Sequence, residues 1–158
     1  MIGSNSRKII ESMSDIVWAI NPENDSFEKI IIRMRSFAHQ LFKARKVEYT
    51  FEVDEKLNKM VLPMQVRKNF YLVFKEAITN VIKYSEASRV LILLYEDRGA
   101  IMLKIRDNGK GIPTDAKAKG NGLLNMTRRA TDIKATLNII SKEGGGTEIE
   151  LLLGNSKK

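Results

Sequence analysis

The sequence predicts an α+β fold, a two-layer sandwich in which helices cover one face of a mixed, mostly antiparallel sheet. Three or four segments repeat apolar residues at helical spacing, and about five others have the short apolar pattern of strands. The later strands are separated by tight turn sequences, so they are expected to meet in hairpins. Of the 158 residues, 43% are hydrophobic and 29% charged, a composition typical of one globular domain.

The first helix is expected from about Arg7 to Ile20, where four apolar residues draw a single seam: Ile9, Met13, Ile16 and Ile20. This seam is typical of the tail of a longer, dimerising helix, and an ordinary amphipathic helix folded onto the domain explains it equally well. Pro22 ends the helix, because proline disfavours helical geometry in the residue before it. We therefore divide the chain into a helix and linker (1–25), a main domain (26–153) and a polar tail (154–158).

Two more helices and a strand make up the next part of the chain. Ser26 stands where a cap is expected for a helix from Phe27 to about Arg45, whose apolar residues repeat every three or four positions. Val47 to Val53 alternates as a strand. Pro63 suits the first turn of a helix that is expected from about Met64 to Tyr84.

The second half of the chain predicts two hairpins with a helix between them. A strand from Arg89 to Tyr95 leads through a turn signal, Asp97-Arg98-Gly99, into a strand from Ala100 to Asp107. A loop over 112–119 and a helix from Gly122 to about Ile133 follow. The last two strands, joined by three glycines, are Thr136–Ser141 and Thr147–Leu153.

One side of the third predicted helix carries polar residues within an otherwise apolar segment. Glu76, Asn80 and Lys83 lie at i, i+4 and i+7, which places them on one side within two turns. Asparagine is a poor helix former, and an amide oxygen that binds Mg²⁺ would explain Asn80. Glu76 would then lie beside the metal and Lys83 against a phosphate. An exposed polar face with a Glu76–Asn80 hydrogen bond is the alternative.

A carboxylate ends the strand that precedes two glycines. Ionised Asp107 can only accept hydrogen bonds, so it could accept from the exocyclic N6 amine of adenine, where guanine presents an acceptor. Gly109 and Gly111 allow a backbone with positive φ to approach a flat base closely. Ordinary turn chemistry explains Asp107 to Gly109 as well, but it does not explain Gly111 or the proline at position 113.

Two further glycine clusters follow. Gly120 and Gly122 open a helix whose free N–H groups and dipole favour the phosphates of a nucleotide. The glycines at 144–146 precede Thr147, whose hydroxyl could face the base. Each cluster has a simpler explanation, namely a loop of small residues before a helix and a flexible hairpin loop. Neither cluster matches a Rossmann fingerprint or a P-loop.

Taken together, these segments resemble the catalytic ATP-binding domain of sensor histidine kinases, in the superfamily of DNA gyrase, MutL and the heat-shock chaperone ATPases. The segments that carry the resemblance are an N box (Glu76–Ser85), a G1 box (Asp107–Ile112), a G2 box (Gly120–Met126) and a last glycine motif (Gly144–Thr147). The resemblance covers about residues 26–153 and implies ATP and Mg²⁺ as cofactors, bound between the two layers.

The subfamily that the chain resembles is the nitrate-sensor and LytS-like type. Met13 to Pro22 is similar to the exit of the dimerisation helix in these kinases. Tyr84 departs from the pattern, since many of these relatives have histidine there.

The resemblance implies that Asn80 holds Mg²⁺, with Glu76 beside it as the second catalytic residue. The residues that it implies for nucleotide binding are Asn80, Lys83, Asp107, Gly109, Gly111, Gly120, Gly122, Leu123 and Thr147. In the family, the γ-phosphoryl group of ATP passes to a histidine on the dimerisation domain and then to an aspartate of a response regulator. The expected partners are therefore the dimerisation (phosphoacceptor) domain of a homodimeric parent kinase and a response regulator.

The single histidine, His39, does not match the phosphoacceptor pattern of this family. An acceptor is usually followed by an acidic residue, whereas Gln40 follows His39. On its predicted helix, His39 points roughly 120° away from the apolar stripe, which predicts an exposed side chain. The chain would thus hold the donor half of the reaction and be nearly inactive alone.

Charge and composition limit the alternative functions of the chain. The net charge of +8 favours anionic partners, but the basic residues are scattered, so no nucleic-acid patch is expected. The chain has no cysteine and no apolar run of about 20 residues, so we expect neither disulfides nor membrane contact by this segment. A cytoplasmic location is expected, whether or not the parent protein is anchored in a membrane. The alternatives are a gyrase- or MutL-type ATPase, an anti-sigma-type serine kinase and a basic nucleic-acid-binding domain.

Overall fold

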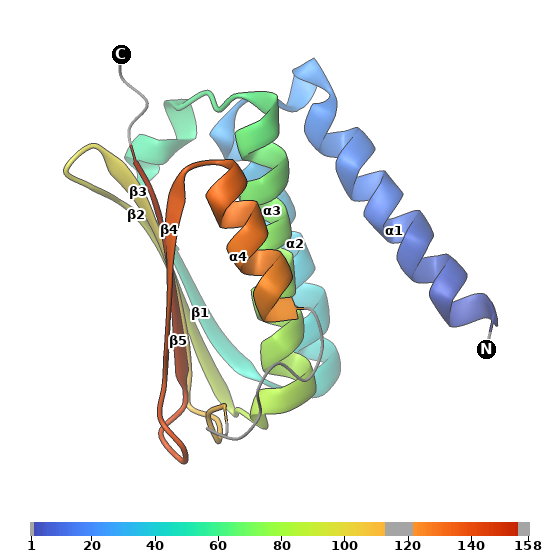
Figure 1. Ribbon diagram of the computed structural model, residues 1–158, viewed down its shortest axis with the longest axis vertical. Helices are drawn as coiled ribbons and strands as arrows, with labels where there is room; N and C mark the ends of the chain where they lie inside the picture. The colour runs from blue at the N-terminus through green and yellow to red at the C-terminus, as the bar shows by residue number, and fades with distance from the viewer. Residues whose placement is uncertain (1, 113–121, 155–158) are drawn as a thin grey trace.

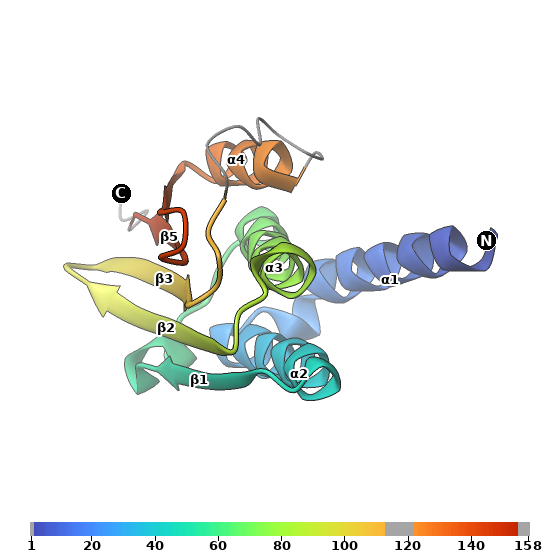
Figure 2. The same ribbon diagram turned by 90° about the horizontal axis from the view of Figure 1, so that it is seen from below.

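The computed structural model describes residues 2–112 and 122–154 and has the predicted α+β architecture (Figure 1). Its main elements are α1 (Ile2–Ile20), α2 (Phe27–Arg45), β1 (Glu48–Val53), α3 (Met64–Asn80), β2 (Arg89–Asp97), β3 (Ala100–Asp107), α4 (Gly122–Asp132), β4 (Ala135–Ser141) and β5 (Thr147–Leu153). The strands form one mixed sheet in the order β1-β2-β3-β5-β4. Helices α2, α3 and α4 all cover the same face of this sheet (Figure 2).

Three of the four strand pairings are antiparallel. β2 and β3 form a hairpin through Arg98 and Gly99, whose φ angles are both positive (52° and 84°), as the turn signal in the sequence predicts. β4 and β5 form the second hairpin, and β5 also pairs with β3. β1 runs parallel to β2, a pairing that the sequence pattern does not predict, since α3 separates the two strands along the chain.

The core lies between the sheet and the helix layer. Side chains alternate along the strands, so every second residue of β2, β3 and β5 is buried against the helices. α2 and α3 contribute four phenylalanines that are fully buried: Phe27, Phe42, Phe70 and Phe74. Burial of a side chain of this size stabilises a fold by about 1.5–3 kcal/mol. This packing fixes α3, the helix that carries Glu76 and Asn80, against the sheet.

α2 begins without the side-chain cap that the sequence predicts. Ser26 occupies the N-cap position, yet its side chain makes no capping hydrogen bond. Ser26 instead forms a β-bridge with Val61, and the Phe27 N–H donates to the Met60 carbonyl (2.8 Å). The main chain thus supplies a partner at the helix start, so the hydroxyl is not needed there.

The third helix does not continue as an α-helix to Tyr84, as the sequence predicts. α3 ends at Asn80 and is followed by one π-helical turn, η3 (Val81–Ser85), after which Glu86 adopts a positive φ of 54°. π turns are rare and frequently lie at functional sites. Here the wider turn carries Lys83 and Tyr84, so their directions differ from those of a continuous α-helix.

The other bounds agree with the sequence to within two residues, with two exceptions. α1 begins at Ile2 rather than near Arg7. The connector after β1 contains a 3-10 helix, η2 (Glu55–Lys59). The loop predicted over 112–119 lies, from residue 113 on, outside the described residues.

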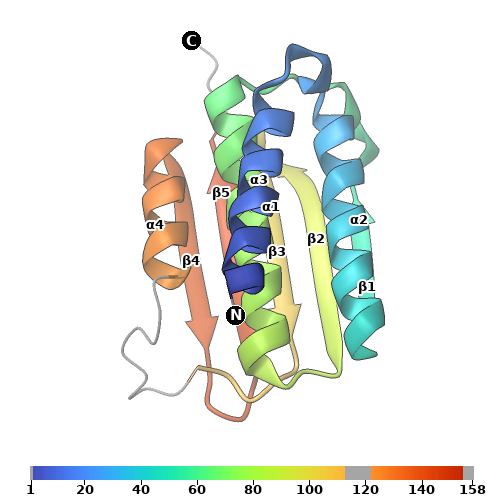
Figure 3. The ribbon, with the colours of Figure 1, turned by 90° about the vertical axis from the view of Figure 1, so that its right-hand side faces the viewer.

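The C-terminal half of α1 is attached to the helix layer by an ion cluster around one buried carboxylate. Asp15, which is 5% exposed, accepts from Arg33 of α2 (2.7 Å) and from Lys75 of α3. The Arg33 guanidinium also lies over the Trp18 ring, 4.8 Å from its centroid. Figure 3 shows α1 in front of α3, and its N-terminal half projects away from the sheet in Figure 1.

The face of α1 that does not pack on the domain is apolar and exposed. Its exposed large side chains are Ile9, Ile10, Met13, Ile16, Val17 and Ile20. We call this set the α1 stripe; it contains the seam that the sequence predicts. No helix among residues 2–112 and 122–154 is long and apolar enough to cross a membrane.

Candidate functional site

A cleft of about 560 Å³ opens between α3 and the sheet, where β3 ends and β5 begins, toward the lower end of the molecule in Figure 1. The residues that line it are Glu76, Ala77, Asn80, Val81, Lys83, Tyr84, Ser85, Glu86, Asp107, Lys110, Gly111, Ile112, Gly122, Leu123, Asn125, Thr147 and Ile149. The cleft therefore has an apolar interior and polar groups on both walls, as ligand sites usually do.

The helix wall of the cleft carries Glu76 and Asn80, one turn apart on α3. Gly122, the first residue of α4, lies directly against both of them. A Cβ on Gly122 would be 2.4 Å from Glu76 Oε1 and 3.4 Å from the amide atoms of Asn80. The two side chains thus converge on the start of α4, where free N–H groups favour an anion. Lys83 lies on the π turn at the rim and is exposed.

The sheet wall carries Asp107, whose side chain is buried (5% exposed). Its Oδ1 accepts the Gly109 N–H (2.8 Å), and the Thr147 N–H also donates to the carboxylate. Burial raises the pKa of Asp107 above its ordinary value, and the two backbone hydrogen bonds partly offset this rise. The Asx-turn that the sequence offered as an alternative is therefore present, and it holds the carboxylate in place at the cleft.

Two glycines allow three backbone segments to touch at the floor of the cleft. A Cβ on Gly109 would lie 2.1 Å from the Ser85 carbonyl oxygen. A Cβ on Gly111 would lie 2.2 Å from the Lys142 carbonyl oxygen, and Gly111 also has a φ of +76°. Any other residue at either position would force the segments apart.

The β4–β5 hairpin closes the floor from the other side. The Lys110 N–H donates to the Ser85 carbonyl (2.8 Å), and the Lys110 carbonyl accepts from the Gly144 N–H (2.7 Å). A Cβ on Gly146 (φ +83°) would lie 2.1 Å from the Asp107 carbonyl oxygen. The sequence predicts only a flexible loop at Gly144, whereas the structure shows it hydrogen-bonded to the segment that follows Asp107.

Eight of the ten predicted site residues line the cleft: Glu76, Asn80, Lys83, Asp107, Gly111, Gly122, Leu123 and Thr147. Gly109 does not line it and instead packs beneath it against Ser85. Gly120 lies outside the described residues.

Sequence reasoning missed several residues of the cleft. Lys110, Ile112 and Asn125 lie inside the motifs but carried no assigned role. Ile149 lies two residues after Thr147 on the same strand face, so strand alternation could have identified it. Tyr84 reaches the cleft through the π turn, for which the sequence has no clear signal.

The oxygen donors fit a metal ion that is shared with phosphates. Glu76 and Asn80 offer one carboxylate and one amide, and no group of three or more His, Cys, Asp or Glu that could hold a metal occurs among the described residues. Mg²⁺ commonly takes one or two protein oxygens and completes its shell with water and phosphate oxygens.

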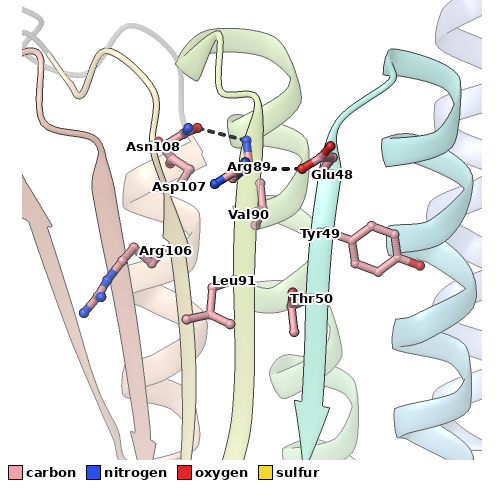
Figure 4. Close-up of a pocket in the computed structure, with 9 residues that line it drawn as sticks. All are labelled: Glu48, Tyr49, Thr50, Arg89, Val90, Leu91, Arg106, Asp107 and Asn108. Atoms are coloured by element: carbon pink, nitrogen blue, oxygen red, sulfur yellow. Dashed lines mark hydrogen bonds and ion pairs between the residues drawn. The ribbon is translucent and has the colours of Figure 1, made fainter.

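A second hollow, of about 460 Å³, lies on the sheet over β1, β2 and β3 (Figure 4). Two of its charged groups pair with glutamates: Arg89 with Glu48 (3.3 Å) and Arg106 with Glu148 of β5 (2.5 Å). Asp107, which lines the cleft, borders this hollow as well. Asn108 accepts from the Arg89 backbone N–H (2.9 Å). Apart from Asp107, which it shares with the cleft, the polar groups named here are paired within the sheet, and we assign no function to this hollow.

A family model and several curated proteins resemble the part of the chain that forms the cleft. The model of the histidine kinase-, DNA gyrase B- and HSP90-like ATPases matches residues 65–156, more than half of the chain. Sensor protein VraS of Staphylococcus haemolyticus is 35% identical over 91 residues, which are 57% of this chain and 26% of that protein. Sensor histidine kinase LiaS of Bacillus subtilis is 39% identical over 87 residues, 54% of this chain and 24% of that protein. The chain thus spans about a quarter of the length of these relatives.

Solved structures share the fold at low identity. The histidine kinase domain of the blue-light activated kinase EL346 from Erythrobacter litoralis has a TM-score of 0.69 and 17% identity, covering 92% of this chain and 75% of that one. The histidine kinase AdeS from Acinetobacter baumannii also has a TM-score of 0.69, at 16% identity, covering 96% of this chain and 79% of that one.

Proposed function

This chain belongs to the family of histidine kinase-, DNA gyrase B- and HSP90-like ATPases, and from this membership we propose that its cleft binds ATP together with Mg²⁺. One observation carries the proposal: a buried acceptor, Asp107, and an oxygen pair, Glu76 and Asn80, face one cleft from opposite walls. A purine at the first and phosphates at the second would span the cleft from the sheet to α3.

The adenine end of the site would be the sheet wall. Asp107 is held by two backbone N–H groups and accepts hydrogen bonds, so it would pair with the N6 amine of the base. Gly111 leaves room for a flat ring beside it, and Ile149 supplies apolar surface. Thr147, paired with Asp107 across β3 and β5, would add its hydroxyl.

The phosphate end would be the helix wall. Asn80 would hold Mg²⁺, with Glu76 oriented beside it, and bound Mg²⁺ would supply neutralisation of the phosphate charge. Lys83 would contribute a point charge at the rim. Gly122 and Leu123 begin α4, whose first N–H groups favour an anion. Gly120 keeps its predicted role in the same segment.

The reaction that we propose is phosphoryl transfer by a two-component sensor kinase. The bond from the γ-phosphorus to the bridging oxygen breaks, a bond to an imidazole nitrogen of a separate phosphoacceptor domain forms, and ADP leaves. A response regulator would receive the group next. His39 is unsuited as the acceptor, because it is exposed on α2 and hydrogen-bonded to the Tyr49 hydroxyl of β1 (2.9 Å).

We further propose that residues 1–25 are the end of a dimerisation helix and its linker. The α1 stripe is a contiguous apolar surface of the kind that marks an interface. Sedimentation equilibrium tests this proposal. A Met13→Glu variant should lose self-association, and equal association of the variant and the wild-type protein would contradict the proposed interface.

Because such kinases use ATP, we place this domain in the cytoplasm, which fractionation of the parent protein would check.

Titration calorimetry with ATP and GTP, each with Mg²⁺, tests nucleotide binding. We expect ATP to bind and GTP to bind far more weakly. Asp107→Asn should weaken ATP binding roughly 10- to 150-fold, since a hydrogen bond to a charged group contributes about 1.5–3 kcal/mol. Asp97→Asn, at the far end of β2, is the matched control and should bind normally.

The same titration separates the alternatives. Equal affinity for ATP and GTP, or unchanged affinity in Asp107→Asn, would overturn the adenine role. A basic nucleic-acid-binding domain would instead bind DNA with an affinity that falls steeply with salt. A phosphorylation assay separates the enzyme classes. The proposed kinase should phosphorylate a supplied dimerisation domain, whereas a gyrase-type ATPase would hydrolyse ATP steadily and a serine kinase would phosphorylate a serine.

A further inference from the structure

Three oxygen-bearing side chains form one row across the sheet at the cleft. Asp107 of β3 is the register partner of Thr147 of β5, and Thr147 is the partner of Ser141 of β4. Asp107 and Thr147 are buried and line the cleft. Ser141 is exposed and lies behind Thr147, outside the lining residues.

Ser141 joins two parts of the site through its hydroxyl. Its Oγ accepts the Ile112 N–H (2.6 Å) and lies 3.0 Å from Thr147 Oγ1. A serine hydroxyl has one proton to donate and two acceptor positions. The Ile112 N–H occupies one acceptor position, which leaves the Ser141 proton and the second acceptor position for Thr147.

The direction of the Ser141–Thr147 hydrogen bond determines whether Thr147 presents a hydrogen-bond donor or only an acceptor to the cleft. If Thr147 donated to Ser141, Thr147 would present only lone pairs beside the acceptor-only carboxylate of Asp107. If Ser141 donates, the Thr147 proton is free to point into the cleft, where a donor then lies beside an acceptor. Because Asp107 and Thr147 are neighbours in register and both are buried, the second arrangement, which places a donor beside the carboxylate, is the favourable one.

We propose that Ser141 is a positioning residue for base recognition, which directs the Thr147 proton toward N1 of adenine. The inference rests on the proposed nucleotide site and deepens it. Adenine presents a donor at N6 and an acceptor at N1, whereas guanine presents the opposite pair. With Asp107 as acceptor and Thr147 as donor, the cleft would distinguish the two bases at two adjacent atoms.

Calorimetric titration with Mg·ADP and with Mg·1-deaza-ADP, in which a C–H replaces N1, tests this role. The wild-type protein should bind the 1-deaza analogue about 3- to 10-fold more weakly, as expected for one neutral hydrogen bond. In Ser141→Ala no hydroxyl at position 141 holds the Thr147 hydroxyl in this orientation, so the ratio should fall toward one, and Ser141→Thr, which keeps the hydroxyl, should restore it. Thr136→Ala removes an exposed hydroxyl elsewhere on β4 and should leave the ratio unchanged.

The ratio separates positioning from general damage. Loss of the Ile112 hydrogen bond in Ser141→Ala weakens both ligands equally and cancels in the ratio. A wild-type ratio in Ser141→Ala, or a ratio of one in the wild-type protein, would overturn the role of Ser141 while nucleotide binding stands. Failure of the wild-type protein to bind ADP at all would instead overturn the nucleotide site itself. If thermal unfolding shows that Ser141→Ala does not fold, Ser141→Cys, a weak donor of similar shape, provides the same measurement.

Discussion

Two glycines of the site have the same backbone conformation but different surroundings. Gly111 and Gly144 have φ angles of +76° and +77°. A Cβ on Gly111 would collide with the Lys142 carbonyl oxygen at 2.2 Å, whereas a Cβ on Gly144 would meet nothing within 4 Å. Conformational strain and steric exclusion can therefore be separated in this protein by comparing the two positions.

We predict that Gly111→Ala and Gly144→Ala lose similar stability from strain but differ in binding. Each places alanine at positive φ, which costs about 1 kcal/mol in the free energy of unfolding. Only Gly111→Ala must also push the β4–β5 hairpin away from the cleft, so its affinity for Mg·ADP should fall at least about tenfold, as for one lost hydrogen bond. Calorimetry and urea unfolding measure both quantities, and equal affinities in the two variants would contradict the prediction.

Single site residues were predictable where their chemistry is unusual for their position. Asn80 inside a helix and Asp107 before two glycines are such cases, and both line the cleft. Ser141 was not predictable, because a serine at a strand end has no distinguishing chemistry. Its partner Ile112 lies 29 residues away along the chain, so only the folded structure brings the two together.

At the scale of elements, the docking of α1 depends on charges as well as on packing. Asp15 of α1 pairs with both α2 and α3, through Arg33 and Lys75. The backbone carbonyl of Ala19 adds a hydrogen bond from Arg67 Nε (3.1 Å). Together these contacts set the angle at which α1 leaves the domain.

We predict that Asp15→Asn destabilises the protein by about 1.5–3 kcal/mol, the contribution of a hydrogen bond to a charged group, because Asp15 is buried while Arg33 and Lys75 are partly exposed. Burial, and secondly Asp15, raises the pKa of Tyr71 to about 12, so the same substitution should also lower that pKa. Urea unfolding and the ultraviolet absorbance of tyrosinate measure these effects. The matched control is Glu48→Gln: its partner is Arg89, both side chains are more than three-quarters exposed, and the loss should stay below about 1 kcal/mol. Equal losses in the two variants would contradict the buried role of Asp15.

The elements themselves were largely predictable, because apolar periodicity and turn residues determine them locally. The π turn after Asn80 was not, since it carries ordinary helix-compatible residues and arises where the chain must reach Glu86 in a left-handed conformation. The parallel pairing of β1 with β2 was also missed, because it depends on how α3 packs across the sheet. The π turn matters most for function, as it determines where Lys83 and Tyr84 lie.

At the scale of the whole molecule, the fold class followed from patterning, while the strand order β1-β2-β3-β5-β4 did not. Hydrophobic alternation shows which face of a strand is buried but not which strand is its neighbour. The order is nevertheless what creates the site, because it brings the end of β3 and the start of β5 together opposite the end of α3.

The strand order buries the Asp107 carboxylate at the proposed binding site, and this burial lowers the stability of the folded protein. Burial raises the pKa of Asp107 in the folded protein, so the folded state favours the protonated acid. The contribution to stability is then fully present below the pKa of the unfolded chain and is lost as the pH rises through the raised folded value. At neutral pH, ionised Asp107 therefore destabilises the empty protein, a trade-off common at functional sites.

We predict that Asp107→Asn raises the melting temperature of the empty protein at neutral pH and reduces its response to nucleotide. The amide oxygen can still accept from the backbone N–H groups, so the Asx-turn survives without the buried charge. Mg·ADP at 100 times its wild-type dissociation constant should stabilise the wild-type protein by about 2.7 kcal/mol and the variant, which binds roughly 10- to 150-fold more weakly, by only about 0.3–1.4 kcal/mol, whereas GDP should give almost no shift. The advantage of the variant should shrink as the pH falls through the raised pKa and vanish below the ordinary range of aspartate, because Asp107 is then neutral in both states. Thermal unfolding from neutral to acidic pH, with and without nucleotide, measures all of these effects. A variant that melts lower than the wild-type protein at neutral pH would show that the carboxylate stabilises the fold and that its burial has no cost.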